Sequence, residues 1–573
     1  MNLAENAEAM NAGTHPGYEA TALEGLTLSL EVLNQKRIKV AINGGALNSQ
    51  GLAQDVQKMV EEKKLNLKVA WVSGDNLMDR AEELLHGQTK HLDADNSQVR
   101  LAKDTDGFLD DPKKPLVSCN AYLGARAITL ALRQGADIVI CGRVSDASPV
   151  IAAAQWWHGW SDTAYDELAG ALIAGHLIEC STYSTGANFA GFYKYETSAL
   201  LDLGLPIVEI ESSGECTVTK ADKFNGIVNT DTIACQLLYE LQGDIYLNSC
   251  VKADISNVSI SQEAENRVHV EGIKGHPPPE TTKLAVYYSG GWQCEITMNA
   301  TGYATEKKYD LFEAQIKHSL KNWGVLDKFD ILECFRAGVP QPNANFQMAA
   351  TTYMRVFVQA VEKMTLFMFL KACGHNGMQH FAGANPRISC CASGDNRTAV
   401  PKTFLAYYPG MISQKLLNEE VHFLGPEPAT YSAGHPPVYE ALAPRRNFPP
   451  TNPLSIDSFG ETVLRPLGDI ALARSGDKGA NINIGIFVHT DEEWDWLRSF
   501  LTAAKMEELV GDDWKPDFYI ERVEFTHLKA VHFVIYGILG RGVSSSSRLD
   551  SLGKAFAEYI RFRHVPIPIK FLQ

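Results

Sequence analysis

The sequence predicts an α/β protein in which helices cover a parallel sheet, with an antiparallel β-rich portion and a separate ferredoxin-like α+β domain at the C-terminus. Three observations predict this class. Short apolar runs alternate with helical patterns over residues 37–141, and segments of alternating apolar and polar residues follow over 205–300. From residue 482 onward, the expected elements have the order β-α-β-β-α-β.

Three apolar runs in the first part have the character of buried strands: "RIKVAI" (37–42), "LKVAWVS" (67–73) and "ADIVIC" (136–141). Helical patterns between them occupy residues 50–63 and the stretch "NAYLGARAITLALRQ" (120–134). Strands that alternate with helices in this way form parallel sheets. The third run is the most apolar, so it is expected in the middle of the sheet.

The chain changes character after residue 162. A helix is expected over 163–180, and segments such as "VHVEGI" and "LAVYYS" predict antiparallel strands within 205–300. Helical patterns return over 309–322 and 352–372. Residues 384–455 are then rich in proline, glycine and asparagine, which is typical of a connecting segment.

These elements divide the chain into a disordered or extended N-terminus (1–16), an α/β domain (17–440), a linker (441–455) and a ferredoxin-like domain (456–573). The order of the elements expected in the last domain supports its assignment as ferredoxin-like. These are strand 482–488, helix 491–509, strands 518–526 and 531–537, helix 549–560 and strand 565–571.

Composition excludes several classes of protein. The chain has 573 residues and a net charge of −16, so it lacks the basic face that nucleic acids and anionic membranes require. No apolar run reaches the roughly 18 residues of a transmembrane helix, and the polar N-terminus has no secretory signal, so a cytoplasmic location is expected. The 11 cysteines, including adjacent Cys390 and Cys391, form no CxxC pair and predict reduced thiols.

The stretch "CGRVSDASPV" (141–150) directly follows the strand expected at 136–141. Ligands of α/β proteins bind beyond the carboxyl ends of strands, so Arg143 is a candidate anion clamp and Asp146 a candidate acid or base, with Ser145 beside them. The alternative is structural. Asp146 or Ser145 would then cap the next helix, with Pro149 in its first turn.

Two further segments offer substrate-binding groups. "NGGALNSQG" places Asn43, Gly44 and Gly45 between a strand and a helix, where backbone amides can hold a phosphate or carboxylate. The spacing matches no nucleotide-binding motif, and a tight turn is the alternative. Asn120 precedes an expected helix, so it is either a substrate-binding residue or a simple helix cap.

The densest polar cluster is "AGHLIECSTYSTGANFAGF", in which His176 and Glu179 share one helix face. Such a pair can share a proton or bind a metal, and Thr185 and Asn188 follow in a loop. No other cluster has metal-ligand spacing, so neither a metal nor a cofactor is expected. In the C-terminal part, "RSGDKGANINIG" combines Arg474, Asp477 and Lys478 in a loop that can bind an anion. A structural turn is the alternative in both places.

Several of these segments resemble the AtuA family, named for acyclic terpene utilisation. They are "INGGALN", "VSGD", "CNAYLGARAI", "GADIVICGRVSDAS", "AGHLIECSTYSTGANFAGF" and "YYSGGWQCE". The C-terminal "ARSGDKGANINIGIF" and "AVHFVIYGILGRGVSSSS" resemble the ferredoxin-like domain that is often fused to it. The chain departs from the family ahead of "GYEATALEGL", where relatives usually have one more strand and a glycine-rich turn.

The resemblance implies a role in breaking down branched acids or their acyl-CoA thioesters, or in secondary metabolism. We expect a lyase, either a hydratase or dehydratase or a C–C lyase, working as a homo-oligomer on a small-molecule acid or acyl-CoA. Such chemistry needs an acid clamp, a base and donors for an enolate oxygen. We assign Arg143 and Lys478 as clamps, Asp146 as base, His176 or Glu179 as acid and the Gly44–Gly45 amides as donors. Asn120, Thr185 and Asn188 would orient the substrate.

Two other functions stay open. The first is a non-catalytic binding or assembly subunit of an acyl-CoA pathway enzyme, which the apparent lack of the first strand favours. The second is a thioester hydrolase. If Asp146, His176 and Gly44 line one pocket, the lyase is favoured; if Asp146 only caps a helix and His176 is buried alone, the binding subunit is favoured.

Overall fold

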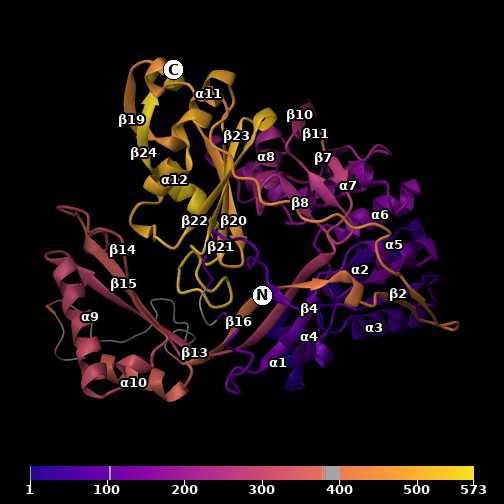
Figure 1. Cartoon of the computed structure of the whole chain (residues 1–573), viewed down its shortest axis with the longest axis horizontal. Helices are drawn as coiled ribbons and strands as arrows, with labels where there is room; N and C mark the ends of the chain where they lie inside the picture. The colour runs from indigo at the N-terminus through magenta and orange to yellow at the C-terminus, as the bar shows by residue number, and fades with distance from the viewer. Residues whose placement is uncertain (1, 102–104, 377–378, 380, 383–399) are drawn as a thin grey trace.

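The computed structural model describes residues 2–101, 105–376, 379, 381–382 and 400–573. Figure 1 shows three bodies: an α/β body, a lobe that contains α9 (Thr305–Asn322) and α10 (Lys363–His375), and the C-terminal domain. The 21-residue strand β13 (Thr281–Thr301) joins the first two bodies, because its first half belongs to the α/β body and its second half to the lobe.

A five-stranded sheet forms the centre of the α/β body, with the order β1-β5-β2-β17-β18. β1 (Val40–Ile42), β5 (Ile138–Ile140) and β2 (Val69–Ser73) are parallel, and β5 lies between the other two. β17 (Glu420–Phe423) and β18 (Ala429–Ser432) continue the sheet antiparallel. The three runs predicted as strands are therefore strands.

Helices cover both faces of this sheet. α2 (Ala20–Lys36) and α3 (Ser49–Glu62) pack on Ile138 and Ile140 on one face. On the other face, Val139 packs in the core that contains α5 (Arg126–Arg133), α6 (Ser148–His158) and α7 (Tyr165–Ile178). Because consecutive side chains of a strand point to opposite faces, an entirely apolar strand such as β5 must be covered on both.

Antiparallel strands are present within residues 205–300, as the alternating pattern predicts, but the antiparallel portion also includes strands outside that range. It includes β6 (Pro206–Ile210), β7 (Cys216–Lys220), β10 (Ser259–Ala264) and β11 (Arg267–Glu271), and β8 (Ile245–Leu247), β9 (Lys252–Asp254) and β12 (Lys274–His276). A third sheet has the order β14-β15-β13-β16-β3, with β4 also paired to β13. Its other strands are β14 (Ile331–Ala337), β15 (Thr351–Ala360), β16 (Lys402–Ser413), β3 (Lys90–His91) and β4 (Leu116–Ala121).

The C-terminal domain has a four-stranded antiparallel sheet with the order β20-β21-β23-β22, consistent with a ferredoxin-like fold. Its strands are β20 (Leu472–Lys478), β21 (Asn481–Phe487), β23 (Ala530–Tyr536) and β22 (Tyr519–Phe525), and its helices are α11 (Asp491–Phe500), α12 (Ala503–Val510) and α13 (Phe556–Phe562). The last strand, β24 (His564–Pro568), pairs with β19 (Thr462–Pro466). The predicted β-α-β-β-α-β order assigns the sheet edge beside β21 to the last strand. In the structure, β20 occupies this edge instead.

Both faces of this C-terminal sheet are buried. Ile482, Ile484 and Ile486 face the domain's own helices, whereas the intervening Asn483 donates a hydrogen bond of 3.0 Å to the carbonyl of Leu238. Leu238 ends α8 (Thr230–Leu238) of the α/β body. The C-terminal domain is thus docked by its sheet onto the larger body.

Some segments differ from the sequence-based expectation because long-range pairing overrides local pattern. Residues 116–121 form β4, paired with β13, so the helix predicted from residue 120 begins at Arg126. The first half of the helix predicted at 352–372 is β15, which pairs with β13 over ten residues. "SGDK" continues strand β20 and is not a loop.

The N-terminal segment and the proline-rich segment also differ from expectation. Asn2–Asn11 form helix α1, where a disordered or extended segment is predicted. Strands β16, β17 and β18 lie within the segment 384–455, while residues 441–450 contain neither helix nor strand. Arg446 holds that segment to the α/β body through ion pairs with Asp244 and Asp254, at 2.8 and 3.2 Å.

Two remaining expectations concern cysteines and membranes. The nine cysteines in the described ranges are free thiols, and Cys390 and Cys391 lie outside those ranges. No helix among the residues that the structure describes is both long and apolar enough to span a bilayer.

Candidate functional site

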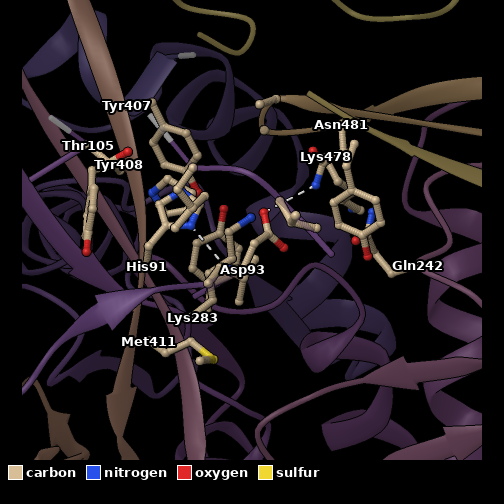
Figure 2. A pocket seen from close by; sticks show the side chains of 18 of the residues that line it. His91, Asp93, Thr105, Gln242, Lys283, Tyr407, Tyr408, Met411, Lys478 and Asn481 are labelled. Carbon is tan, nitrogen blue, oxygen red and sulfur yellow. Dashed lines mark hydrogen bonds between the residues drawn. The ribbon is translucent and has the colours of Figure 1, made fainter. Parts of the chain in front are cut away.

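A cavity of about 710 Å³ lies where the C-terminal domain meets the α/β body. Its walls come from β13 and β16, from the segments that follow β5 and α8, and from the β20–β21 hairpin. Figure 2 shows Lys283 and Tyr407 on one wall and Lys478 and Asn481 on another. Two domains therefore build one cavity between them, which is a common location for small-molecule sites.

The "GRVSDAS" segment forms part of this wall. Ser145 and Asp146 line the cavity, and the half-buried Asp146 carboxylate forms an ion pair with Arg143. Helix α6 has Ala147 at its N-cap position and no side-chain cap, so Asp146 does not serve as one. Arg143 also stacks on Tyr122, with its guanidinium carbon 4.6 Å from the ring centre.

The buried Asp75 explains why position 142 of this segment is a glycine. A side chain at Gly142 would place its Cβ 2.5 Å from the Asp75 carboxylate. That carboxylate accepts hydrogen bonds from the Arg143 amide at 2.8 Å and from Asn120 Nδ2 at 3.0 Å. Burial raises the pKa of Asp75, and these donors oppose the rise. Asn120 is fully buried in β4. Its hydrogen bond to Asp75 helps to hold the segment that contains Gly142 and Arg143.

The glycine-rich turn is placed differently. Asn43, Gly44 and Gly45 lie outside the cavity lining. The Gly45 amide donates to the Cys141 carbonyl at 2.9 Å, so its one hydrogen is already used. Close packing of this turn against the end of β5 explains why position 45 is a glycine, because a Cβ there would lie 2.5 Å from the Cys141 carbonyl oxygen. A bound ligand is not needed to explain it.

His176 and Glu179 lie behind the cavity wall. The buried imidazole has Nδ1 3.4 Å from the Glu179 carboxylate and Nε2 3.1 Å from the Leu237 carbonyl. Burial raises the pKa of Glu179, and the charge of Asp146 adds to the rise. Tyr246, whose ring centre is 4.9 Å from that of His176, lies on the cavity wall.

The metal alternative for this pair has no third ligand. Within the described residues, the one set of three groups close enough to share a metal ion is Glu215, His269 and Glu271. Those residues lie on or beside β7 and β11, and the set does not include His176 or Glu179.

Thr185 and Asn188 take part in contacts that join chain segments. Thr185 Oγ1 donates to the Gly204 carbonyl at 2.7 Å. The Asn188 carbonyl accepts a hydrogen bond of 2.7 Å from Arg474, whose guanidinium lies between Tyr183 and Tyr239 at 4.6 and 4.4 Å from their ring centres. Neither Thr185 nor Asn188 lines the cavity.

Lys478 and Asp477 bring charge from the C-terminal domain. Lys478 lines the cavity opposite the Asp146 segment, and its Nζ donates to Glu240 at 2.7 Å. Burial would raise the pKa of Glu240, but the Lys478 charge outweighs it and lowers the value to about 2. Burial and the negative charge of Glu240 raise the pKa of Asp477 to about 6.

Sequence reasoning missed several groups of the cavity. Tyr122, Lys283 and Tyr407 come from three chain segments that the pairing of β4, β13 and β16 brings together. The one local signal was a lysine inside the apolar alternation of "TTKLAVYYS". Glu240 and Tyr246 follow α8 and had no local signal of a site.

The fold and the cavity define a two-domain α/β protein with a cavity at its domain junction. The chain belongs to the acyclic terpene utilisation family AtuA, whose family model matches residues 1–423, and the AtuA ferredoxin-like domain matches residues 465–566. The resemblance inferred from the sequence is thereby confirmed. No curated protein and no solved structure matches the chain.

Proposed function

We propose that the protein is a lyase that adds or removes water, or cleaves a C–C bond, next to the carbonyl of a branched carboxylic acid or its acyl-CoA thioester. The observation that carries the proposal is the shared cavity. Asp146 and Lys478, which come from different domains, line one space of about 710 Å³ that also has an apolar portion around Leu172, Ile245 and Met411. An aliphatic acyl chain fits the apolar portion, and proton transfer fits the polar one.

In this mechanism Asp146 is the base. Its carboxylate is half exposed to the cavity, and the ion pair with Arg143 holds it in place. In the hydration direction, Asp146 takes a proton from water as the water oxygen bonds to the β-carbon and the double bond shifts to form the enolate. The protonated Asp146 then gives that proton to the α-carbon as the enolate collapses, which restores the carboxylate. Dehydration reverses each of these steps.

Tyr246 replaces the glycine amides as the donor to the enolate oxygen. Its phenol lines the cavity, and burial together with the charge of Glu179 raises its pKa well above the usual range. The hydroxyl therefore stays protonated and can donate a hydrogen bond to an oxyanion. The His176–Glu179 pair behind it fixes the ring and supplies negative charge that holds the proton.

The test is Asp146→Asn, which keeps the shape of the side chain but removes the base. Purified protein is incubated with a panel of branched acids and their CoA thioesters, and products are read by mass spectrometry as gain or loss of water or as cleaved fragments. We expect turnover by the native protein and a loss of about 10²-fold or more in Asp146→Asn, with little change in melting temperature.

The other outcomes identify the alternatives. A thioesterase would release free CoA and the unchanged acid. Ligand binding without turnover in the native protein would identify a binding or assembly subunit. Full turnover by folded Asp146→Asn would remove Asp146 from the mechanism.

A further inference from the structure

Among the residues that the structure describes, five lysine and arginine side chains line the cavity: Arg100, Lys114, Lys283, Lys478 and Arg541. Arg100 and Lys114 form ion pairs with Asp517 and Asp111, and Arg541 donates a hydrogen bond of 3.2 Å to Gln359.

Three cations of the described ranges lie near Tyr407, and two of them have an acidic partner within the protein. Arg143 forms an ion pair with Asp146, and Lys478 forms one with Glu240. The third is Lys283 on β13, which lines the same cavity. An anionic ligand can therefore form a stronger electrostatic interaction with Lys283 than with the two cations that already have an acidic partner.

Lys283 has no acidic partner within ion-pair distance among the residues that the structure describes. Its Nζ instead lies 5.0 Å from the centre of the Tyr122 ring and 5.7 Å from that of Tyr407. Figure 2 shows Lys283 and Tyr407 together on the cavity wall. The Tyr122 ring is shared with Arg143, so two positive charges lie close to one aromatic face.

Aromatic rings compensate the charge of an ammonium ion only in part. A partly buried cation without an ion-pair partner gains most from an anionic ligand that also accepts a hydrogen bond. The Asp477 carboxyl group lies within electrostatic range of Lys283, and its negative charge opposes a ligand with more than one negative charge. The charge balance therefore favours a monoanion.

The surroundings of Lys283 indicate the rest of the ligand. Ala406, Pro409, Met411 and Pro279 line the cavity around β13 and β16. A carboxylate at Lys283 could extend an aliphatic chain along these groups and remove it from water.

We infer that Lys283 is the anion-binding group of the cavity and that the ligand carries a free carboxylate on an aliphatic chain. This inference rests on the proposed function and narrows it. A thioester substrate would need a second, free carboxyl group, whereas a simple branched acid satisfies Lys283 directly.

Binding of octanoate and of octanamide tests the inference, because the two compounds have similar shape and differ in charge. Isothermal titration of the native protein should show octanoate binding about tenfold or more tightly than octanamide. Lys283→Met should lose this preference, and Lys283→Arg should keep most of it. Lys415→Met is the matched control, because Lys415 forms an ion pair with Glu280 at 3.1 Å and does not line the cavity.

Each result separates the inference from the proposed function, since binding is measured without turnover. Equal binding of octanoate and octanamide by the native protein would overturn the inference, as would unchanged octanoate binding in Lys283→Met. Circular dichroism establishes that each variant is folded, and Lys283→Arg keeps the test valid if Lys283→Met unfolds. Charge-dependent octanoate binding together with absence of turnover on the acid panel would leave the inference standing and overturn the lyase.

Discussion

At the scale of the residue, Asp477 is a carboxyl group whose charge changes near neutral pH. Burial and the Glu240 charge raise its pKa to about 6 from the ordinary value of 3.8. Between these two values the folded state binds more protons than the unfolded state, so stability falls as pH rises through 6. Ionised Asp477 therefore costs stability at neutral pH.

Asp477→Asn should consequently raise the melting temperature at pH 7.5, and the gain should shrink as the pH falls from about 6 to about 4 and vanish below that. Thermal unfolding followed by circular dichroism from pH 4 to pH 8 measures this. Asp512→Asn, at an exposed position, is the control and should show no such pH dependence. A gain that stays constant over the whole range would contradict the raised pKa.

Individual residues also show what could be predicted. Arg143, Ser145, Asp146 and Lys478 were identifiable because each stands at or near the end of an apolar strand, where polar groups are costly unless paired or used. The Asp75 carboxylate behind Gly142 was missed, because nothing local links positions far apart in the chain.

At the scale of the element, apolar runs predicted strands reliably, whereas the composition of a turn did not predict its role. β1, β2 and β5 were predicted because an apolar strand covered on both faces leaves a plain sequence signal. The glycine-rich turn at Gly44–Gly45 has the composition of an anion cradle, yet its geometry serves close packing. Lys283 meets Tyr407 only through the register of β13 against β16, and register has no local signature.

The docking of β21 on α8 leads to a prediction about Gly485. A Cβ at this position would lie 2.7 Å from the Leu238 Cβ. Gly485→Ala should therefore cost about 1–3 kcal/mol, because two backbones must move apart. Gly374→Ala is the control, since Gly374 lies in α10 with nothing near its added Cβ.

Chemical denaturation and limited proteolysis measure the effect of these two variants. Gly374→Ala should be neutral or slightly stabilising, because alanine favours a helix over glycine. Gly485→Ala should unfold at lower denaturant and become more sensitive to protease near residues 441–455. If the two variants had equal stability and equal protease sensitivity, β21 and α8 would be far enough apart to accommodate the added methyl group.

At the scale of the whole molecule, the cavity exists only while two domains stay docked. Lys478, Asn481 and Tyr536 belong to the C-terminal domain, whereas Asp146 and Lys283 belong to the α/β body. Contacts outside the cavity hold this arrangement, among them the Asn483–Leu238 hydrogen bond and the His489–Asp231 contact at 2.9 Å. Domain docking is therefore coupled to ligand binding, and each should stabilise the other.

Arg474 tests this coupling because it contacts the α/β body without lining the cavity. Arg474→Gln removes a buried guanidinium from between Tyr183 and Tyr239 and loses its bond to the Asn188 carbonyl, a change worth roughly 2–4 kcal/mol. Octanoate affinity should fall about tenfold, and small-angle scattering should show a larger radius of gyration. Arg465→Gln, which removes only an exposed ion pair with Asp469 inside the C-terminal domain, should change neither. If Arg474→Gln weakened the domain junction but left octanoate affinity intact, the ligand would be held by one domain alone, and the proposal that the junction forms the catalytic site would fail with it.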